Sequence, residues 1–166
     1  GKYDDAIEVL DQAVRLQSAP QGATTDLAVS LSDLANAHFY LGHYDTSDAL
    51  NRRVLEMNRQ LYGDRHPQVA DTLINLGAIQ FQLGHYVESE KFNRQALEIV
   101  EAWYGKEHPE TADTMTILGQ SLAFQQRFDD AAALLQQSLA ILEKDYGAVH
   151  PRVAFALMEL GNIAIR

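Results

Sequence analysis

The chain has 166 residues, of which 46% are hydrophobic and 22% are charged. This composition supports a buried core and excludes a disordered tail. There are 23 Asp and Glu residues against 13 Lys and Arg residues, which gives a formal net charge of −10. Because this charge repels phosphate backbones and anionic lipids, we expect neither nucleic acid nor a membrane as a partner.

Targeting and redox signals give little further information. No apolar run approaches the roughly 18 residues that span a bilayer, and no signal peptide is recognisable. There is no cysteine, which excludes disulfides and thiolate metal sites. The sequence begins with Gly1 instead of methionine and starts inside a repeat unit, so we expect a piece of a longer protein. We expect this piece to be cytoplasmic.

The strongest feature is a repeat with a period of 42 residues. The dipeptide His-Pro occurs at His66, His108 and His150, and 108 − 66 = 150 − 108 = 42. The same step separates the members of three other sets of markers, which are Tyr62-Gly63, Tyr104-Gly105 and Tyr146-Gly147, then Leu76-Gly77, Leu118-Gly119 and Leu160-Gly161, and finally Tyr44, Tyr86 and Phe128. Repetition at this period predicts a stack of similar structural units.

Each unit has the pattern of two helices. Val69, Ala70, Leu73 and Leu76 recur at spacings of three and four after Pro67, and a second apolar stripe of the same kind follows Tyr86. The segment 83–86 predicts a tight turn between them. Glycine before each His-Pro suits the end of one helix, and the proline suits the first turn of the next.

In chain order we predict a second helix at about 2–17, followed by three helix pairs and a lone first helix. The predicted pairs cover about 24–61, 66–103 and 108–145, and the lone first helix covers about 150–166. Both ends are therefore half-units. Because a repeat buries its apolar face only against its neighbours, the terminal half-repeats are possible sites of self-association.

Several residues within the helices call for a structural explanation. Gly77, Gly119 and Gly161 lie inside helices, where glycine costs roughly 1 kcal/mol relative to alanine. We therefore expect a close approach of the partner helix, with small residues opposite at Ser89, Ala96 and Ala131. Equivalent histidines of successive units would lie about 10 Å apart, too far to share a metal ion, so we expect them to cap helices. His38 is expected to be a satisfied core residue.

These markers resemble a known repeat family. Leu73-x-x-Leu76-Gly77, Gly84-x-Tyr86, the small residue Ser89 and Ala96-Leu97 are similar to the tetratricopeptide consensus, with Leu73 in the place of its tryptophan. The 42-residue step and the motif Tyr-Gly-x-x-His-Pro resemble the variety found in kinesin light chains and in many bacterial signalling proteins. The resemblance implies an all-α fold, a right-handed α-α superhelical solenoid of antiparallel helix pairs. The first unit departs from it, because 18–22 replaces that motif.

The resemblance also implies a binding groove on the concave face, lined by the first helices of the units. Carried over residue by residue, the lining consists of Ser32, Asp33, Asn36, Tyr40, Asp71, Ile74, Asn75, Ala78, Gln82, Asp113, Thr116, Ile117, Gln120, Phe124, Phe155, Glu159 and Asn162. This set contains no Lys or Arg, so it does not match the tetratricopeptide domains that clamp a C-terminal carboxylate. Of the asparagines with which kinesin light chains hold peptide backbone, only Asn75 is present.

The sequence therefore predicts a scaffold that binds a protein or peptide with apolar anchors and a neutral or basic charge. Phosphate-binding, dinucleotide-binding, zinc-protease and serine-hydrolase motifs are absent from the sequence, so we expect no enzyme activity, cofactor or metal. Alternatives are a docking or regulatory arm of a larger signalling enzyme, such as a bacterial serine/threonine kinase, and a structural self-association segment. A further alternative is a solvated groove, with the partner bound by loops or flanking domains.

Overall fold

The computed structural model describes residues 2–17 and 24–165. Within these residues all regular structure is helical, and the helices are α1 (Lys2–Gln17), α2 (Thr25–Tyr40), α3 (Tyr44–Tyr62), α4 (Pro67–Gln82), α5 (Tyr86–Tyr104), α6 (Pro109–Phe124), α7 (Phe128–Tyr146) and α8 (Pro151–Ala164). The predicted all-α fold is confirmed. The unusual connection at 18–22 lies outside the described residues.

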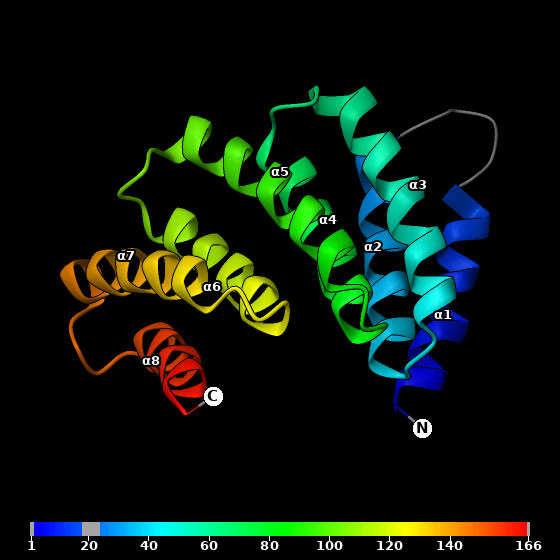
Figure 1. Cartoon of the computed structure of the whole chain (residues 1–166). Coiled ribbons are helices and arrows are strands. Elements are labelled where there is room, and N and C mark those ends of the chain that lie inside the picture. Colours follow the sequence, from blue (N-terminus) through cyan, green and yellow to red (C-terminus); the bar gives the residue numbers. More distant parts are fainter. Residues whose placement is uncertain (1, 18–23, 166) are drawn as a thin grey trace.

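The helices form one curved row in chain order (Figure 1), with α1 and α8 at its two ends. Each helix packs against the next one along the chain, and α6 also contacts α8. Helices α2, α4, α6 and α8 are the first helices of their units, and α1, α3, α5 and α7 are second helices. This arrangement is the predicted solenoid of helix pairs.

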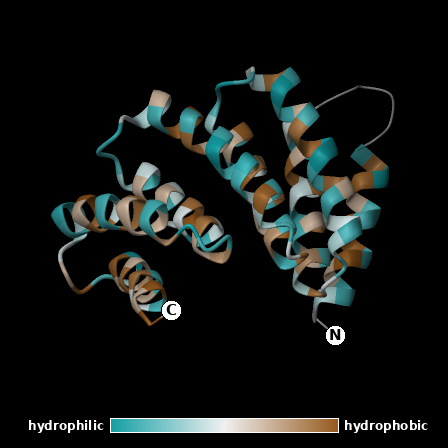
Figure 2. Ribbon diagram, in the orientation of Figure 1, coloured by the Kyte–Doolittle hydropathy of each residue, from teal (hydrophilic) through white to brown (hydrophobic). Residues whose placement is uncertain are grey.

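Two of the hydrophobic clusters draw buried residues from neighbouring units. One cluster joins Leu55 of α3, Leu73 of α4 and Ala96 of α5. Another joins Leu142 of α7 to Val153 of α8. Hydrophobic and hydrophilic residues accordingly alternate along each helix (Figure 2), because one side packs against neighbours and the other faces solvent. Neighbouring units therefore share part of their core.

The motif Tyr-Gly-x-x-His-Pro makes the connection between units. In its three copies the histidine Nδ1 accepts a hydrogen bond from the backbone N–H two residues later, at 3.2, 3.2 and 3.3 Å. The histidine ring stacks on the preceding tyrosine, with centroid distances of 4.6, 4.7 and 4.3 Å. Gly63 has φ 84° and ψ 164°, a conformation almost restricted to glycine. The predicted capping role of the histidines is confirmed.

The turn inside each unit requires a left-handed residue. Gly42 and Gly84 supply it with φ 78° in the first two complete units. Gln126 occupies the same place between α6 and α7 with φ 62°, where a side chain is unfavourable. The turn geometry is therefore kept even where the sequence lacks glycine.

The glycines inside the helices mark close helix contacts in two units. A Cβ on Gly77 would collide with the side-chain amide of Asn93, and a Cβ on Gly119 would lie 2.9 Å from Leu135 Cγ and 3.4 Å from the Ala131 carbonyl oxygen. The predicted close approach is thus confirmed for these two. Of the predicted small residues, Ala131 lies against Gly119, whereas the atoms nearest a Cβ on Gly77 belong to Asn93, which was not among them. Gly161 has no such neighbour within 4 Å.

The prediction of a core position for His38 was wrong. This residue is half-buried, and its Nδ1 lies 3.2 Å from Nδ1 of His43 in the turn before α3. Burial and then the neighbouring His43 lower the pKa of His38. The ring belongs to the turn at the edge of the helix pair and not to the core between the helices.

Candidate peptide-binding groove

The described residues include cavities between consecutive first helices. Two lie between α2 and α4, with volumes of about 130 and 200 Å³, and one lies between α6 and α8, with a volume of about 200 Å³. We name them after one lining residue each, as the Asp71 cavity, the Tyr40 cavity and the Phe124 cavity. We call these three cavities together the groove.

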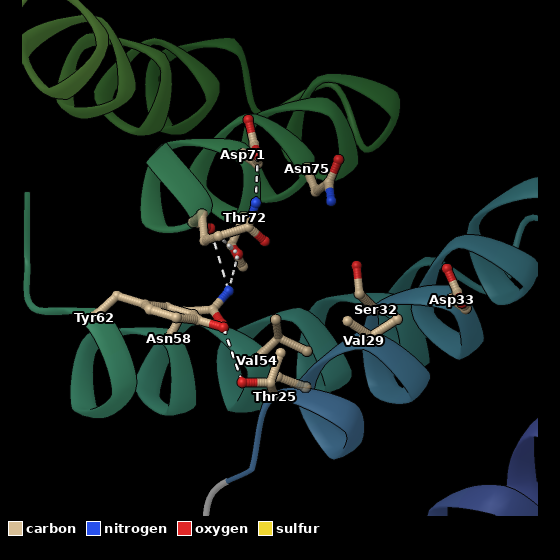
Figure 3. A pocket seen from close by; sticks show the side chains of 12 residues that line it. Thr25, Val29, Ser32, Asp33, Val54, Asn58, Tyr62, Asp71, Thr72 and Asn75 are labelled. Carbon is tan, nitrogen blue, oxygen red and sulfur yellow. Dashed lines mark hydrogen bonds between the residues drawn. The ribbon is translucent and has the colours of Figure 1, made fainter. Parts of the chain in front are cut away.

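The Asp71 cavity has a polar rim and an apolar floor. Ser32 and Asp33 come from α2, and Asp71 and Asn75 come from α4, on either side of the same space (Figure 3). The floor is formed by Ala28, Val29 and Val54. Four polar side chains above an apolar surface can hold both the backbone and a side chain of a peptide.

Residues of α3 fix the position of the two walls of this cavity. Asn58 Nδ2 donates to the backbone carbonyl of Gln68 at 3.2 Å and lies 3.1 Å from Thr72 Oγ1, both on α4. Tyr62 OH lies 3.1 Å from Thr25 Oγ1 on α2. The second helix thereby connects the two first helices, and the cavity is formed before any ligand arrives.

The Asp71 cavity carries negative charge without a cation of its own. Among the described residues, neither Asp33 nor Asp71 has an ion-pair partner, and Asp71 accepts a 3.4 Å hydrogen bond from Gln68 Nε2. Desolvation by the groove walls, and then the carboxylate of Glu110, raise the pKa of Asp71. A positively charged group of a ligand would relieve both effects.

The Tyr40 cavity adjoins the Asp71 cavity. It is lined by Asn36, Tyr40, Asn75 and Ala78, among others, so Asn75 belongs to both cavities. Tyr40 is 66% exposed, and the ring of Tyr3 stacks on it with centroids 5.5 Å apart. An amide between two adjacent cavities can donate to and accept from an extended backbone at once.

The Phe124 cavity differs from the Asp71 cavity, because its carboxylate already accepts a hydrogen bond and its aromatic ring is packed. Gln120 Nε2 donates to Glu159 Oε1 at 3.1 Å, and Glu159 is only 5% exposed. The ring of Phe124 packs edge-on against Phe81, with centroids 4.7 Å apart. Asn162 completes the predicted residues of this cavity. Gln120 and Glu159 are therefore already engaged with each other.

An arginine that the sequence reasoning missed neutralises Asp113, one of the predicted lining residues. Arg152 of α8 pairs with Asp113 at 2.6 Å and with Glu110 at 3.0 Å, both on α6. Desolvation raises the pKa of Asp113, and Arg152 opposes that shift. The long side chain of Arg152 reaches Asp113 from the first turn of α8, and neither residue lines the three cavities.

The cavities bring together most of the predicted lining residues. These are Ser32, Asp33, Asn36, Tyr40, Asp71, Asn75, Ala78, Gln120, Phe124, Glu159 and Asn162. Phe155 is 40% exposed and Gln82 is exposed, while Ile74 and Ile117 are half-buried. These four and the half-buried Asp113 line none of the three cavities. Ile74 also packs against the cluster of α3, α4 and α5.

Thr116 does not belong to the groove. It is 2% exposed, and its Oγ1 lies 2.7 Å from Ser138 Oγ of α7. Thr116 occupies the same repeat position as Ser32, because 116 − 32 is two steps of 42, but its hydroxyl bonds to its own partner helix α7. The sequence reasoning also missed Thr25, Val29 and Tyr62, which line the Asp71 cavity. The recurrent Tyr-Gly motif was the available signal for Tyr62.

Two negative findings apply to the part of the chain that the structure describes. No group of three or more metal-ligating side chains is placed to hold an ion. No helix there has the length and apolar character to cross a membrane.

Comparison with known proteins identifies the class. The geometry is that of an α-α solenoid with a groove along its first helices. The family model for the tetratricopeptide repeat matches residues 26–102 and 81–144, so the chain belongs to this family. Proteins of this family generally mediate protein–protein interaction. No curated protein sequence matches the chain.

Solved structures share the fold at low sequence identity. The putative kinesin light chain with nearly identical TPR-like repeats from Podosopora anserina, in its Q17M form, has a TM-score of 0.84 and 22% identity over 99% of this chain and 78% of its own. BtubC (BKLC) from P. vanneervenii has a TM-score of 0.87 and 20% identity over 99% of this chain and 66% of its own. The N-terminal domain of stress-induced protein-1 from C. elegans has a TM-score of 0.61 and 18% identity, covering 85% of this chain and 99% of its own. This chain is therefore built like a kinesin light chain-type repeat array.

Proposed function

We propose that the groove binds an extended peptide segment of another protein, with a basic side chain at the Asp71 cavity and apolar side chains farther along. The observation that carries this proposal is the position of Asn75, which lines both cavities between α2 and α4. Neither its amide nor the hydroxyl of Ser32 has a hydrogen-bond partner among the described residues. Both groups therefore have capacity left for a ligand.

The charge distribution supports a basic ligand. Asp33 and Asp71 lie on the same cavity without a cation, whereas Asp113 at the other end is paired with Arg152. A ligand with acidic residues would be repelled at the Asp71 cavity and would gain nothing at the Arg152 pair. We therefore expect a lysine or arginine of the ligand near Asp33 and Asp71.

Apolar anchors have places on both sides of this charge. Val29 is 52% exposed and Tyr40 is 66% exposed, and both line cavities between α2 and α4. Phe124 lines the cavity between α6 and α8. Exposed apolar side chains within a polar groove are typical of peptide-binding surfaces.

A display screen of random peptides tests the proposal. Peptides enriched on the parent protein should share apolar anchors and a basic residue, and they should lose binding to Asn75→Ala. Gln95→Ala is the matched control, because Gln95 is an exposed amide in a cavity between the second helices α3 and α5. If no peptide is enriched, or if Asn75→Ala binds like Gln95→Ala, the groove is not the binding surface.

The charge can be tested separately. The double variant Asp33→Asn and Asp71→Asn keeps the size of both side chains and removes two negative charges. We expect it to bind the enriched peptides more weakly and with less dependence on salt, while a lysine-to-norleucine peptide binds both proteins alike. An unchanged preference for basic peptides would refute the role of these carboxylates.

A further inference from the structure

The junction between α6 and α8 holds a guanidinium that belongs to the protein itself. Nη1 of Arg152 lies 2.6 Å from Asp113 Oδ2 and 3.0 Å from Glu110 Oε1. Cζ of the same side chain lies 5.5 Å from the ring centroid of Tyr146. Two carboxylates and one aromatic face therefore hold a single positive charge at this junction.

The corresponding positions between α4 and α6 hold no such cation. Steps of 42 residues relate the two junctions, whose members are Gln68, Asp71, Tyr104 and Glu110 in the earlier one and Glu110, Asp113, Tyr146 and Arg152 in the later one. Glu110 therefore stands at the earlier junction where the later one has its arginine. Asp71 and Glu110 are both exposed, and among residues 2–17 and 24–165 Asp71 has no ion-pair partner. The earlier junction has the anionic groups of a guanidinium site without the guanidinium.

Tyr104 preserves the aromatic face of the later junction. Its ring stacks on His108 with centroids 4.7 Å apart, as the ring of Tyr146 stacks on His150 at 4.3 Å. Both tyrosines are thus held in the same way against the residue that caps the next first helix. Tyr104 is 40% exposed, so a group that arrives from solvent can reach its ring.

We propose that the basic residue of the peptide ligand is an arginine, and that its guanidinium lies between Asp71 and Glu110 over the ring of Tyr104. This assignment rests on the function proposed above and names the side chain that the groove selects. Asn75 lies one helical turn from Asp71 on α4 (Figure 3), so a peptide backbone held by Asn75 passes close to this carboxylate. An arginine side chain spans the remaining distance to α6, as Arg152 does from α8.

Arginine suits this place better than lysine. A guanidinium is planar and has five N–H donors, so it can serve two carboxylates while it lies over a ring. The ammonium group of lysine is a compact and strongly hydrated charge that stacks less well. Because the groups of the junction are exposed, water weakens each ion pair, and we expect a preference for arginine of about fivefold.

Paired peptides measure this preference. Each peptide that the display screen enriches and that loses binding to Asn75→Ala is synthesised with arginine, lysine or citrulline at its basic position. Fluorescence anisotropy gives the Kd of each version. We expect the arginine peptide to bind the parent protein about fivefold more tightly than the lysine peptide. Citrulline keeps the shape of arginine without its charge and should bind most weakly.

Variants of the junction locate the effect. In Glu110→Arg the introduced guanidinium takes the place itself, as Arg152 does one repeat later, so both basic peptides should bind alike and more weakly. Tyr104→Leu removes only the ring and should reduce the preference for arginine to about twofold. Glu107→Arg is the matched control, because it makes the same change of charge where Glu107 pairs with Lys144 of α7, and it should keep the full preference.

Glu110→Arg also gives a test without any ligand. In the parent protein, desolvation and then the carboxylate of Glu110 raise the pKa of Asp71. If the two junctions are equivalent, the introduced guanidinium pairs with Asp71 and lowers this pKa below its ordinary value. NMR of the side-chain carboxyl carbon measures the pKa, and Glu107→Arg should leave it raised.

The outcomes separate this assignment from the proposed function. A pKa of Asp71 that Glu110→Arg does not lower would overturn the arginine site by itself. Peptides that need Asn75 but bind equally well with arginine and lysine would overturn it too, while the peptide-binding groove stands. A screen that enriches no peptide would overturn the proposed function, and the arginine site with it.

Discussion

The helix pairs α4–α5 and α6–α7 have the same geometry but different chemistry at their point of closest approach. In α4–α5 the residue against the glycine is Asn93, whose Nδ2 lies 3.1 Å from Ser121 Oγ and whose Oδ1 has no hydrogen-bond partner. In α6–α7 it is Leu135, which is fully buried. The two side chains are similar in size, so the glycine sets the distance between the helices while the partner only has to fill the space.

The largest effect should come from emptying the apolar contact. Leu135→Ala removes a fully buried side chain and leaves a cavity between α6 and α7, so we expect the free energy of unfolding to fall by about 3 kcal/mol. Urea denaturation followed by circular dichroism measures it. A loss below about 1 kcal/mol would mean that α7 moves inward to fill the space.

The polar contact should be worth less. Asn93→Ala removes the donor to Ser121, but Ser121 keeps Ser89 Oγ at 3.0 Å, and the unpaired Oδ1 disappears with the side chain. We expect the free energy of unfolding to fall by about 1 to 2 kcal/mol in the same denaturation experiment. A loss as large as that of Leu135→Ala would show that the two contacts are equivalent after all.

Replacing glycine by alanine should change the free energy of unfolding in opposite directions at Gly119 and Gly161. Gly119→Ala gains helix propensity but forces a Cβ to 2.9 Å from Leu135 Cγ, and we expect a net loss of about 1 kcal/mol. Gly161→Ala gains the same propensity in open space, and we expect a gain of up to about 1 kcal/mol. Thermal melts at a concentration too low for association compare the two. If both substitutions changed the stability in the same direction, close approach of the helices would not be the reason for glycine.

The turns inside the two helix pairs also differ, because one has glycine at the left-handed position and the other has glutamine. We expect this difference to have the smallest effect on stability. Gly84 has φ 78° before α5, whereas Gln126 has φ 62° before α7. Gln126→Gly should remove the strain of a left-handed side chain and raise the free energy of unfolding by about 0.5 kcal/mol, after the entropy cost of glycine. Gly84→Gln is the reverse control and should destabilise, as measured by the same melts.

The fold was predictable because each repeated marker has a local physical role. Histidine caps a helix, Gly84 bends a turn, and Gly77 admits a neighbouring side chain, so a period of 42 residues contains the instructions for one unit. Asn93 was not among the residues expected opposite the glycines, because the sequence gives the spacing of positions but not the angle at which two helices cross.

The groove was predictable only as far as helical phase determines it. Asn36 lines a cavity, and so do its counterparts at steps of 42 residues, Ala78, Gln120 and Asn162. Thr116 faces Ser138 instead of the groove. Its hydroxyl is satisfied by a hydrogen bond there and needs no contact with solvent. Arg152 escaped notice because a long side chain acts several ångströms from its own Cα, and nothing in the repeat pattern indicates its direction.

The sharing of each hydrophobic cluster among consecutive helices bears on how such a protein changes length. Because the contact between any two neighbouring units has the same form, a gene duplication that inserts one whole unit restores every contact on both sides. An insertion of a few residues inside a helix would instead rotate the side chains that follow it out of their contacts, as for Gly119 and Leu135. The array can therefore lengthen its groove in whole repeats, and the chemistry of the ligand it accepts can then drift one unit at a time.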